Sequence, residues 1–400
     1  MTALALVESN TTGSGRQFCA AARAAGLRPV VLTAAPERYP YLLADAVDHL
    51  PVDTGDPAAV LAGCRALAAG AGLAGVASSS EYFVATAATA AAALGLPAAD
   101  PLALARCRHK DRQRAVLAAA GVPVPAHRAV TAVDAALAAA AELGYPVVVK
   151  PTTGSGSVGV RLCAGPAELA AHAAGLLGAP VDERGRATPR LVLVEEYVRG
   201  PEYSVETFDD TVVGVVAKHL GPAPHFVETG HDMPAPAVPA GLAATAVRAV
   251  RALGLGWGAA HTELRAGPGG PVLIEVNPRL AGGMIPTLVR LATGVDLVAA
   301  TVARAAGRPH PVEPGAGAHA SIRFALTARA GTVEAVGGLA DARGLPGVEL
   351  SEITVAPGAE LEITHSFRDR FGYAVATGPD AATAAGRAER AAAHLRVVTR

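Results

Sequence analysis

The feature that most constrains the fold of this chain is an apolar run that ends in a lysine and continues directly into a glycine-rich segment. Residues 145–150 read YPVVVK, and residues 151–160 read PTTGSGSVGV. Only three of the 34 basic residues are lysines, namely Lys110, Lys150 and Lys218. Lysine presents a compact point charge where arginine presents a planar fork, so a lysine at this junction suits phosphate oxygens. The segment therefore predicts a strand, a phosphate-binding loop and a nucleotide site.

The glycine-rich segment lies between two predicted strands, residues 146–150 and 160–162. Its glycines allow close approach of the backbone, successive N–H groups can form an anion-binding nest, and the hydroxyl groups add donors. No Gly-Lys-Ser/Thr triplet follows, so the segment is not a Walker loop. A flexible hairpin turn is the alternative. The loop residues expected to contact a nucleotide are Thr152, Gly154, Ser155, Gly156, Ser157 and Gly159.

Composition indicates a globular chain with more than one hydrophobic core. The 400 residues are 51% hydrophobic and 17% charged, which predicts about two to four packed units. The net charge of -1 provides no basic field for nucleic acid. The apolar residues 82–99 are interrupted by Gly95 and Pro97, which argues against a membrane span, and the N-terminus reads as a strand rather than a signal peptide.

The cysteines are scattered and form no C-x-x-C pair, so neither a zinc site nor a disulfide framework is indicated. A reduced, cytoplasmic location fits this pattern best. The cysteines are Cys19, Cys64, Cys107 and Cys163.

Residues 1–98 alternate between short apolar runs and alanine-rich helical patterns, which predicts a parallel sheet covered by helices. The expected strands are residues 3–7, 29–33 and 73–77, with a helix from about residue 16. Residues 8–15, ESNTTGSG, are either a ligand-facing loop at the carboxyl end of the first strand or an ordinary turn. No third glycine follows Gly13 and Gly15 at dinucleotide spacing, which disfavours a nicotinamide or flavin site.

The remaining residues predict a compact lobe, a larger sheet and a C-terminal unit. A basic helix over residues 106–120 contains Lys110, and residues 127–187 follow with helix, strand, glycine loop, strand and helix. The runs LVLVEEYV, YSVETF and TVVGVVAKHL predict three strands of a large antiparallel sheet. From about residue 317, short strands and a helix over residues 380–395 predict an α+β unit. The expected fold class is thus α/β together with α+β.

A second chemical pattern lies in residues 258–283, GAAHTELRAGPGGPVLIEVNPRLAGG. Two strands, residues 260–264 and 271–277, are joined by a Gly/Pro turn. Period-two alternation sends Val272, Ile274 and Val276 to one face and Glu275 and Asn277 to the other.

If this hairpin centres near residue 269, Glu263 lies across from Glu275, with Cβ atoms about 4.5–5.5 Å apart. Such carboxylates repel one another unless a cation lies between them. Two glutamates and Asn277 form an oxygen-only ligand set that suits Mg²⁺ or Mn²⁺ rather than zinc. Arg279 can then meet a phosphoryl group on that metal. A solvated edge hairpin with exposed acids is the alternative.

The order of these motifs resembles the ATP-grasp superfamily. The order is Lys110, the strand with Lys150 and its glycine loop, EEYVRGPEYSVE, Lys218, Glu263 and IEVNPR. Within the superfamily the chain is similar to the carboxylate–amine ligases, which include D-alanine:D-alanine ligase, bacterial L-amino acid ligases and glycinamide ribonucleotide synthetase. The resemblance covers nearly the whole chain. It implies a Rossmann-like domain (residues 1–98), a connecting helix (99–126), a small ATP-grasp lobe (127–190), a large lobe (191–312) and a C-terminal α+β domain (313–400).

The resemblance also implies roles for individual residues. Lys110, Lys150 and, less firmly, Lys218 match lysines on the ATP phosphates. Lys150, Lys218 and Arg279 are the expected catalytic residues, and Arg279 stabilises the transferred phosphoryl group. Glu195, with Glu196 and Val198, matches the hinge that binds adenine, and Glu202 matches the glutamate that binds the ribose. Glu263, Glu275 and Asn277 match the metal ligands.

The expected substrate-binding residues are Glu228, His231, Arg279, Gly282 and Gly283. Glu228 and His231 belong to HFVETGHDMPAP, a pattern that resembles the amino acid ligase branch. A structural loop with a solvated acid and a capping histidine is the alternative for this pair.

The implied activity is ATP-dependent amide formation through an acyl phosphate, on amino acids or small carboxylic acids of specialised metabolism. The expected cofactors are ATP and Mg²⁺, with Mn²⁺ as a substitute, and the expected partners are a small carboxylate and an amine. No nucleic-acid or membrane partner is expected, and a homodimer is compatible with the sequence. The alternatives are a biotin-carboxylase-like enzyme, a purine-pathway synthetase and a non-catalytic nucleotide-binding subunit.

Overall fold

The N-terminal part of the chain forms a parallel sheet with helices on both faces. The computed structural model describes residues 1–10, 14–182, 185–315 and 317–400, so Thr11, Thr12 and Gly13 of the predicted ligand-facing loop lie outside the described residues. The strand order is β3-β2-β1-β4, and all pairs are parallel. The elements are β1 (Ala3–Val7), α1 (Ser14–Ala24), β2 (Arg28–Thr33), η1 (Pro36–Arg38), α2 (Tyr41–Ala44), β3 (Asp48–Pro51), α3 (Pro57–Ala69), β4 (Leu73–Ala77) and α4 (Val84–Ala93).

Strand β1 explains why this sheet needs helices on both sides. All five of its residues are buried, but alternate side chains enter different cores. Leu4 and Leu6 join a core shared with α1, whereas Ala3, Ala5 and Val7 join the core beneath α3 and α4. The parallel sheet covered by helices that the sequence predicts for residues 1–98 is therefore confirmed.

Two helices connect this part to the rest of the chain, α5 (Pro101–Cys107) and α6 (Lys110–Ala119). The prediction of one continuous helix over residues 106–120 is wrong, because the backbone of His109 is extended (φ −96°, ψ 105°). The break lets the N–H of Lys110 bond to the carbonyl of Thr152 at 2.8 Å. It thereby places Lys110 beside the glycine-rich loop.

The small lobe is a four-stranded sheet, in the order β5-β8-β6-β7, covered by two helices. The prediction that residues 192–196 join the large sheet is wrong, because β8 pairs with β5 and β6. An apolar run such as LVLV suits either sheet, and alternation does not identify a partner strand. The elements are β5 (His127–Val130), α7 (Val133–Leu143), β6 (Val147–Pro151), β7 (Arg161–Cys163), α8 (Pro166–Gly178) and β8 (Val192–Glu196).

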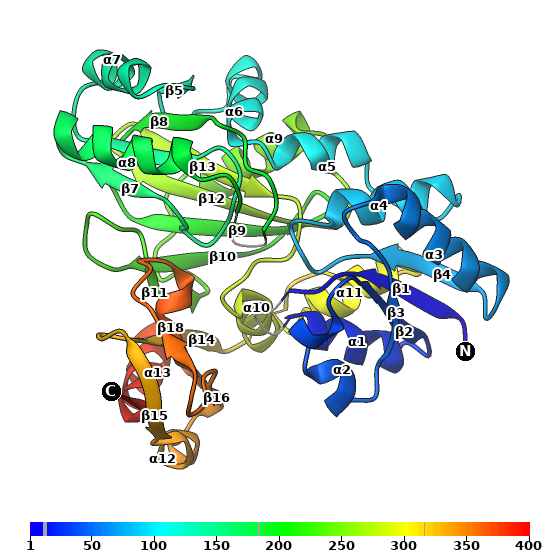
Figure 1. The fold of residues 1–400 in the computed structure, drawn as a ribbon. Coiled ribbons are helices and arrows are strands. Elements are labelled where there is room, and N and C mark those ends of the chain that lie inside the picture. The colour runs from blue at the N-terminus through cyan, green and yellow to red at the C-terminus, as the bar shows by residue number, and fades with distance from the viewer. Residues whose placement is uncertain (11–13, 183–184, 316) are drawn as a thin grey trace.

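A central eight-stranded antiparallel sheet forms the body of the molecule, in the order β13-β12-β9-β10-β11-β14-β18-β16 (Figure 1). Helix α9 packs against β12 and β13, whereas α10 and α11 join the large core beneath β10 and β14. The elements before residue 313 are β9 (Glu202–Phe208), β10 (Thr211–Leu220), β11 (Glu228–Met233), α9 (Leu242–Ala252), β12 (Ala259–Gly267), β13 (Gly270–Asn277), α10 (Ile285–Thr293) and α11 (Leu297–Ala305).

The C-terminal residues extend the same sheet and add a small one, β17-β15-β19. Figure 1 shows these orange and red elements beside β11, opposite the blue N-terminal sheet. The sheets thus run across the predicted domain limits at residues 190 and 312, and those limits stay predictions. The elements are β14 (His319–Leu326), β15 (Gly331–Gly337), α12 (Leu339–Gly344), β16 (Val348–Ile353), β17 (Glu360–Leu361), η2 (Phe367–Asp369), β18 (Arg370–Gly378), α13 (Ala381–His394) and β19 (Arg396–Thr399).

Among the described helices, none alone is long and apolar enough to cross a membrane. Helices α10 and α11 reach that length only as a pair bent by 105°.

Candidate active site

A cavity of about 1300 Å³ lies where the N-terminal sheet, the small lobe, the central sheet and the C-terminal strands meet. Most of the predicted site residues line it, from Lys110 in α6 to Arg279 after β13. Thr152, Gly159 and His231 do not line it. Side chains that the sequence did not suggest also line it. These additional residues include Tyr39, Tyr41, Glu81, His261, Arg265, Phe324 and Arg370.

The hairpin of β12 and β13 places the two expected metal-binding glutamates opposite one another. Glu263 pairs in register with Glu275, as predicted. The register then shifts, and Leu264 pairs with Leu273, so Ile274 is the extra residue of a β-bulge. The prediction that Val272, Ile274 and Val276 share one face is therefore wrong. Ile274 lines the cavity beside Glu275, whereas Leu273 and Val276 pack in the core.

Lys218 holds the Glu263 side of the site together. Its ammonium lies 2.6 Å from Glu263, 2.7 Å from Glu228 and 3.0 Å from Glu202. Burial disfavours the charged form, but the three carboxylates hold the pKa of Lys218 well above its ordinary value. Lys218 is therefore protonated.

His261 is a second cation in this group, and sequence reasoning missed it. Its Nδ1 lies 2.7 Å from Glu206 and its Nε2 lies 3.1 Å from Glu263. Burial opposes protonation, but these carboxylates raise the pKa of His261 to about 9. Despite burial, Lys218 and His261 lower the pKa of Glu263 and hold it ionised.

On the facing side, the buried Lys110 pairs with Glu275, which is partly exposed. The ammonium of Lys110 lies 2.9 Å from Glu275 and donates to the carbonyl of Gly154 at 2.8 Å. This contact joins helix α6, the glycine-rich loop and β13 at one point.

Lys150, Glu195 and Arg114 form a fully buried cluster at the base of the small lobe. Glu195 lies 2.5 Å from Lys150 and 2.8 Å from Arg114. Burial opposes ionisation, but Arg114 and Lys150 lower the pKa of Glu195 to about 2. Burial lowers the pKa of Lys150, and Glu195 counteracts that effect. The carboxylate of Glu195 is thus bound by the protein, while Glu196 and Val198 line the cavity beside it.

The glycine-rich loop has the backbone geometry that the sequence predicted. Gly154, Gly156 and Gly159 all have positive φ angles, of 122°, 65° and 72°. A Cβ atom on Gly156 would lie only 2.3 Å from the ring of Phe367, so the loop packs closely against the C-terminal part of the chain. Ser157 donates its hydroxyl to the carbonyl of Phe226 at 2.9 Å, which fixes the far end of the loop.

Arg279 is held by a residue of the N-terminal sheet. Glu81 follows β4 and accepts hydrogen bonds from Nη2 and Nε of Arg279 at 2.6 and 3.2 Å. Burial opposes both charges, but the pair raises the pKa of Arg279 and lowers that of Glu81. The guanidinium is therefore oriented before any substrate binds.

The predicted substrate residues Glu228 and His231 differ in their surroundings. Glu228 pairs with Arg370 at 2.7 Å, and the guanidinium of Arg370 lies 3.8 Å over the ring of Phe324. Among the described residues, neither ring nitrogen of His231 has a hydrogen-bond partner, since Glu228 is 3.7 Å away. Burial lowers the pKa of His231 to about 3, so the ring is neutral. A Cβ atom on Gly283 would lie 2.7 Å from His231 Nε2, and only glycine fits there.

The other predicted site residues differ in the contacts that they make. Glu202 accepts from Arg265 at 3.0 Å in addition to Lys218. Ser155 and Gly282 line the cavity, and a Cβ atom on Gly282 would meet open space. The hydroxyl of Thr152 is buried, and it has no hydrogen-bond partner within the described chain.

The donors fit a metal–nucleotide complex. Glu263, Glu275 and Asn277 supply hard oxygen atoms of the kind that Mg²⁺ and Mn²⁺ prefer. The described residues contain no cluster of three or more His, Cys, Asp or Glu arranged for a metal ion, and one oxygen of Glu263 and one oxygen of Glu275 are each bound by a lysine. The positive-φ glycines provide the backbone cradle that a phosphate chain requires.

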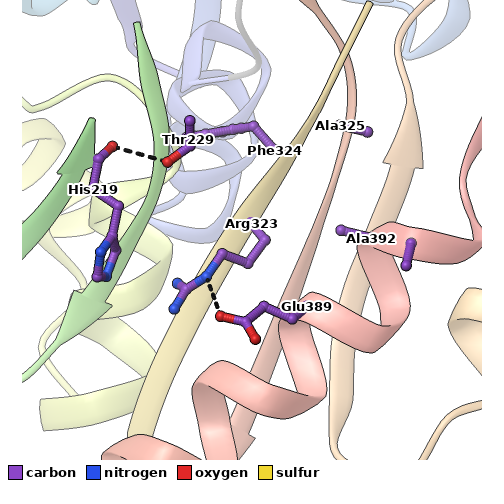
Figure 2. Close-up of a pocket in the computed structure, with 8 residues that line it drawn as sticks. His219, Thr229, Arg323, Phe324, Ala325, Glu389 and Ala392 are labelled. Carbon is purple, nitrogen blue, oxygen red and sulfur yellow. Dashed lines mark hydrogen bonds and ion pairs between the residues drawn. The ribbon is translucent and has the colours of Figure 1, made fainter. Parts of the chain in front are cut away.

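A second, shallower groove lies on the opposite face of the central sheet, against α13 (Figure 2). Lys218 and His219 are neighbours on β10, and Lys218 faces the large cavity while His219 faces this groove. Asp232 binds His219 at 2.6 Å and Arg323 at 2.7 Å, and Arg323 also binds Glu389 at 3.2 Å. The charges of this groove are thus already paired within the protein.

The residues that sequence reasoning missed fall into two classes. His261 and Arg265 lie two residues either side of Glu263 on one strand, so period-two alternation could have placed them on its face. Glu81, Arg114 and Arg370 reach the site from elements far away in sequence. No local pattern marks them.

Comparison with known proteins identifies related families over most of the chain. Residues 19–98 match the ATP-grasp N-terminal domain, residues 143–287 match the ATP-grasp domain, and residues 323–400 match the L-amino acid ligase C-terminal domain 2. The uncharacterized protein y4rH of Sinorhizobium fredii is 40% identical over 385 residues, which cover 96% of this chain and 80% of that protein.

Two further proteins extend the comparison. Carnosine synthase 1 of Gallus gallus is 38% identical over 189 residues, covering 44% of this chain but only 20% of that protein. The structure of L-amino acid ligase from Bacillus licheniformis superposes with a TM-score of 0.84, at 22% identity, over 100% of this chain and 99% of that one. The fold and the family that the motifs predicted are confirmed: this chain belongs to the ATP-grasp family.

Proposed function

We propose that this protein is an ATP-dependent carboxylate–amine ligase that joins amino acids or small carboxylic acids through an acyl phosphate and releases ADP and phosphate. The observation that carries the proposal is the pairing of Glu263 with Glu275 beside Arg279, in one cavity that Lys110 and Lys150 also line. This arrangement places phosphate-binding cations, metal-binding oxygens and an oriented guanidinium around one volume.

The chemistry follows from these positions. A carboxylate oxygen of the first substrate attacks the γ-phosphoryl group of ATP, and the amine then displaces phosphate from the acyl phosphate. Lys110 and Lys150 bind phosphate oxygens, and Arg279 stabilises the charge that develops on the transferred phosphoryl group. Glu263, Glu275 and Asn277 would hold Mg²⁺, which would supply positive charge to the phosphates of ATP.

Two features of this chain prepare the site for that reaction. Glu81 fixes the guanidinium of Arg279 with two hydrogen bonds, so little reorganisation is needed as charge develops. The glycine-rich loop closes against Phe367, and the amide of Phe367 donates to the carbonyl of Gly156 at 3.3 Å. A loop held in this way would shield an acyl phosphate from water, which would otherwise hydrolyse it.

The comparisons support amide formation over the alternatives. Residues 323–400 match the C-terminal domain of L-amino acid ligases, and a relative is named carnosine synthase. Biotin carboxylases and purine-pathway synthetases share the fold. They remain the rival activities, and a carboxylase would need bicarbonate in place of an amine.

Trapping the intermediate tests this proposal. Hydroxylamine should replace the amine and give a hydroxamate of the true acid substrate together with ADP, in a screen of amino acids and small carboxylates read by mass spectrometry. Arg279→Met should lose hydroxamate and amide formation together, whereas Arg290→Met, an exposed control on α10, should keep both. Release of AMP, or loss of only the amine step in Arg279→Met, would contradict the acyl-phosphate mechanism.

A further inference from the structure

Every lysine of the chain is bound to a glutamate of the proposed active site. Lys110 lies 2.9 Å from Glu275, and Lys150 lies 2.5 Å from Glu195. Lys218 binds three glutamates. The three lysines are the predicted phosphate contacts and two of these glutamates, Glu263 and Glu275, are the predicted metal ligands, yet in this structure they bind one another.

Lys218 lies at the centre of three carboxylates from three strands. Glu202 of β9, Glu228 of β11 and Glu263 of β12 approach its nitrogen at 3.0, 2.7 and 2.6 Å. A lysine ammonium has three donors and no acceptor, so these contacts use all three donors. In this arrangement Lys218 cannot also donate to a phosphate.

Lys110 has two protein partners and a comparable degree of burial. It donates to Glu275 and to the carbonyl of Gly154, and it is only 6% exposed. The carbonyl contact ties it to the loop that would receive a nucleotide.

The consequence concerns the metal. A divalent ion bound to Glu263 or Glu275 would lie close to the ammonium that contacts Oε1 of that carboxylate, and the two cations would repel one another. Metal binding without nucleotide would leave the buried Lys110 with only the carbonyl of Gly154, and the buried Lys218 with only Glu202 and Glu228. Nucleotide binding without metal would leave Glu275 without its lysine and Glu263 with only His261, and losing the partner of a largely buried charge is unfavourable.

We propose that Lys110 and Lys218 are positioning counter-ions, which hold the metal-binding glutamates in the nucleotide-free enzyme and transfer to phosphate oxygens only when metal and nucleotide bind together. This inference rests on the proposed function, because it takes Glu263 and Glu275 as metal ligands. The exchange conserves charge pairing: the ammonium groups pass from carboxylate to phosphate, and the carboxylates pass from ammonium to metal. Metal alone should therefore bind poorly.

The lysine content of the chain makes a direct measurement practical. Protein labelled with ¹³C-lysine should give three side-chain signals, which three Lys→Arg variants assign by removing one signal each. The labelled wild-type protein is then titrated with Mg²⁺ alone, with ADP alone and with both. The expected result is that Mg²⁺ alone leaves the signals of Lys110 and Lys218 unchanged, whereas Mg²⁺ with ADP shifts both.

The possible outcomes separate this inference from the proposed function. If Mg²⁺ alone shifts both lysines over the same concentration range as Mg²⁺ with ADP, the counter-ion role is overturned while the ligase proposal stands. If Mg²⁺ with ADP shifts none of the three signals, the nucleotide site itself is wrong and both proposals fail.

Metal binding by variants gives an independent test, measured with Mn²⁺ by electron paramagnetic resonance without nucleotide or substrates. Removing a buried positive charge beside the carboxylates should tighten Mn²⁺ binding by about tenfold or more in Lys218→Met and in Lys110→Met. Lys218→Arg and Lys110→Arg, which keep the charge, should bind Mn²⁺ as weakly as the wild type. Equal Mn²⁺ affinity in the Met and Arg variants would overturn the inference.

Discussion

Replacing Glu195 by glutamine should destabilise the protein in a strongly pH-dependent manner. The carboxylate is buried between Arg114 and Lys150, and its pKa falls from an ordinary 4.5 to about 2. A folded-state pKa below the unfolded value adds stability above the unfolded pKa, and that stability is lost as the pH falls through the folded pKa. The difference of about 2.5 pH units corresponds to about 3 kcal/mol at pH 7. The contribution should shrink to about 1 kcal/mol at pH 3.

The measurement is urea denaturation of the wild type and of Glu195→Gln, followed by circular dichroism at pH 7 and at pH 3. A matched control is Glu142→Gln, because Glu142 forms a surface ion pair with Arg128 in which both side chains are more than half exposed. This control should change the free energy of unfolding by about 0–1 kcal/mol. A loss of less than about 1 kcal/mol in Glu195→Gln at pH 7, or a loss that is equally large at pH 3, would refute the reasoning.

Three further predictions concern catalysis. Lys150→Ala should weaken ATP binding by about 1.5–3 kcal/mol in calorimetry, Lys150→Arg should not restore it fully, and unchanged affinity in the alanine variant would remove this lysine from the site. Glu275→Gln should raise the Mg²⁺ concentration needed for ADP release, with partial rescue by Mn²⁺, and an unchanged Mg²⁺ titration would show that Glu275 binds no metal. Gly156→Ala should raise KM for ATP because its Cβ would displace Phe367, whereas Gly95→Ala, with a similar φ of 68° but open space around it, should leave KM unchanged.

The sequence predicted best those features that depend on neighbours along the chain. The pairing of Glu263 with Glu275 follows from the two-residue alternation of β-strands and a short turn, both of which are local features. The positive-φ loop after Lys150 follows from its glycines in the same way. Ile274 marks where this reasoning fails, because a β-bulge reverses the alternation without any change in composition.

Features that depend on partner choice were not predictable. Strand β8 was assigned to the wrong sheet because an apolar run does not specify which strands it joins. The hydrogen-bond partner of a buried side chain is equally hard to predict from sequence, as Gln113 shows. Its amide exchanges two hydrogen bonds, of 2.8 and 2.9 Å, with the backbone of Val276, which is 163 residues away. This contact covers the open edge of β13, and neither residue carries a local signal of it.

The ion pairs of the site also join the parts of the molecule to one another. Glu81 of the N-terminal region holds Arg279 after β13, and Glu228 of β11 holds Arg370 of β18. The first pair joins the N-terminal region to the central sheet, whereas the second joins two strands of that same sheet. A ligand that binds one member of either pair removes the partner of a largely buried charge, so the other member must find a new partner. Ligand binding in the cavity should accordingly depend on the exchange of ionic partners, and not only on the strength of a single contact with the nucleotide.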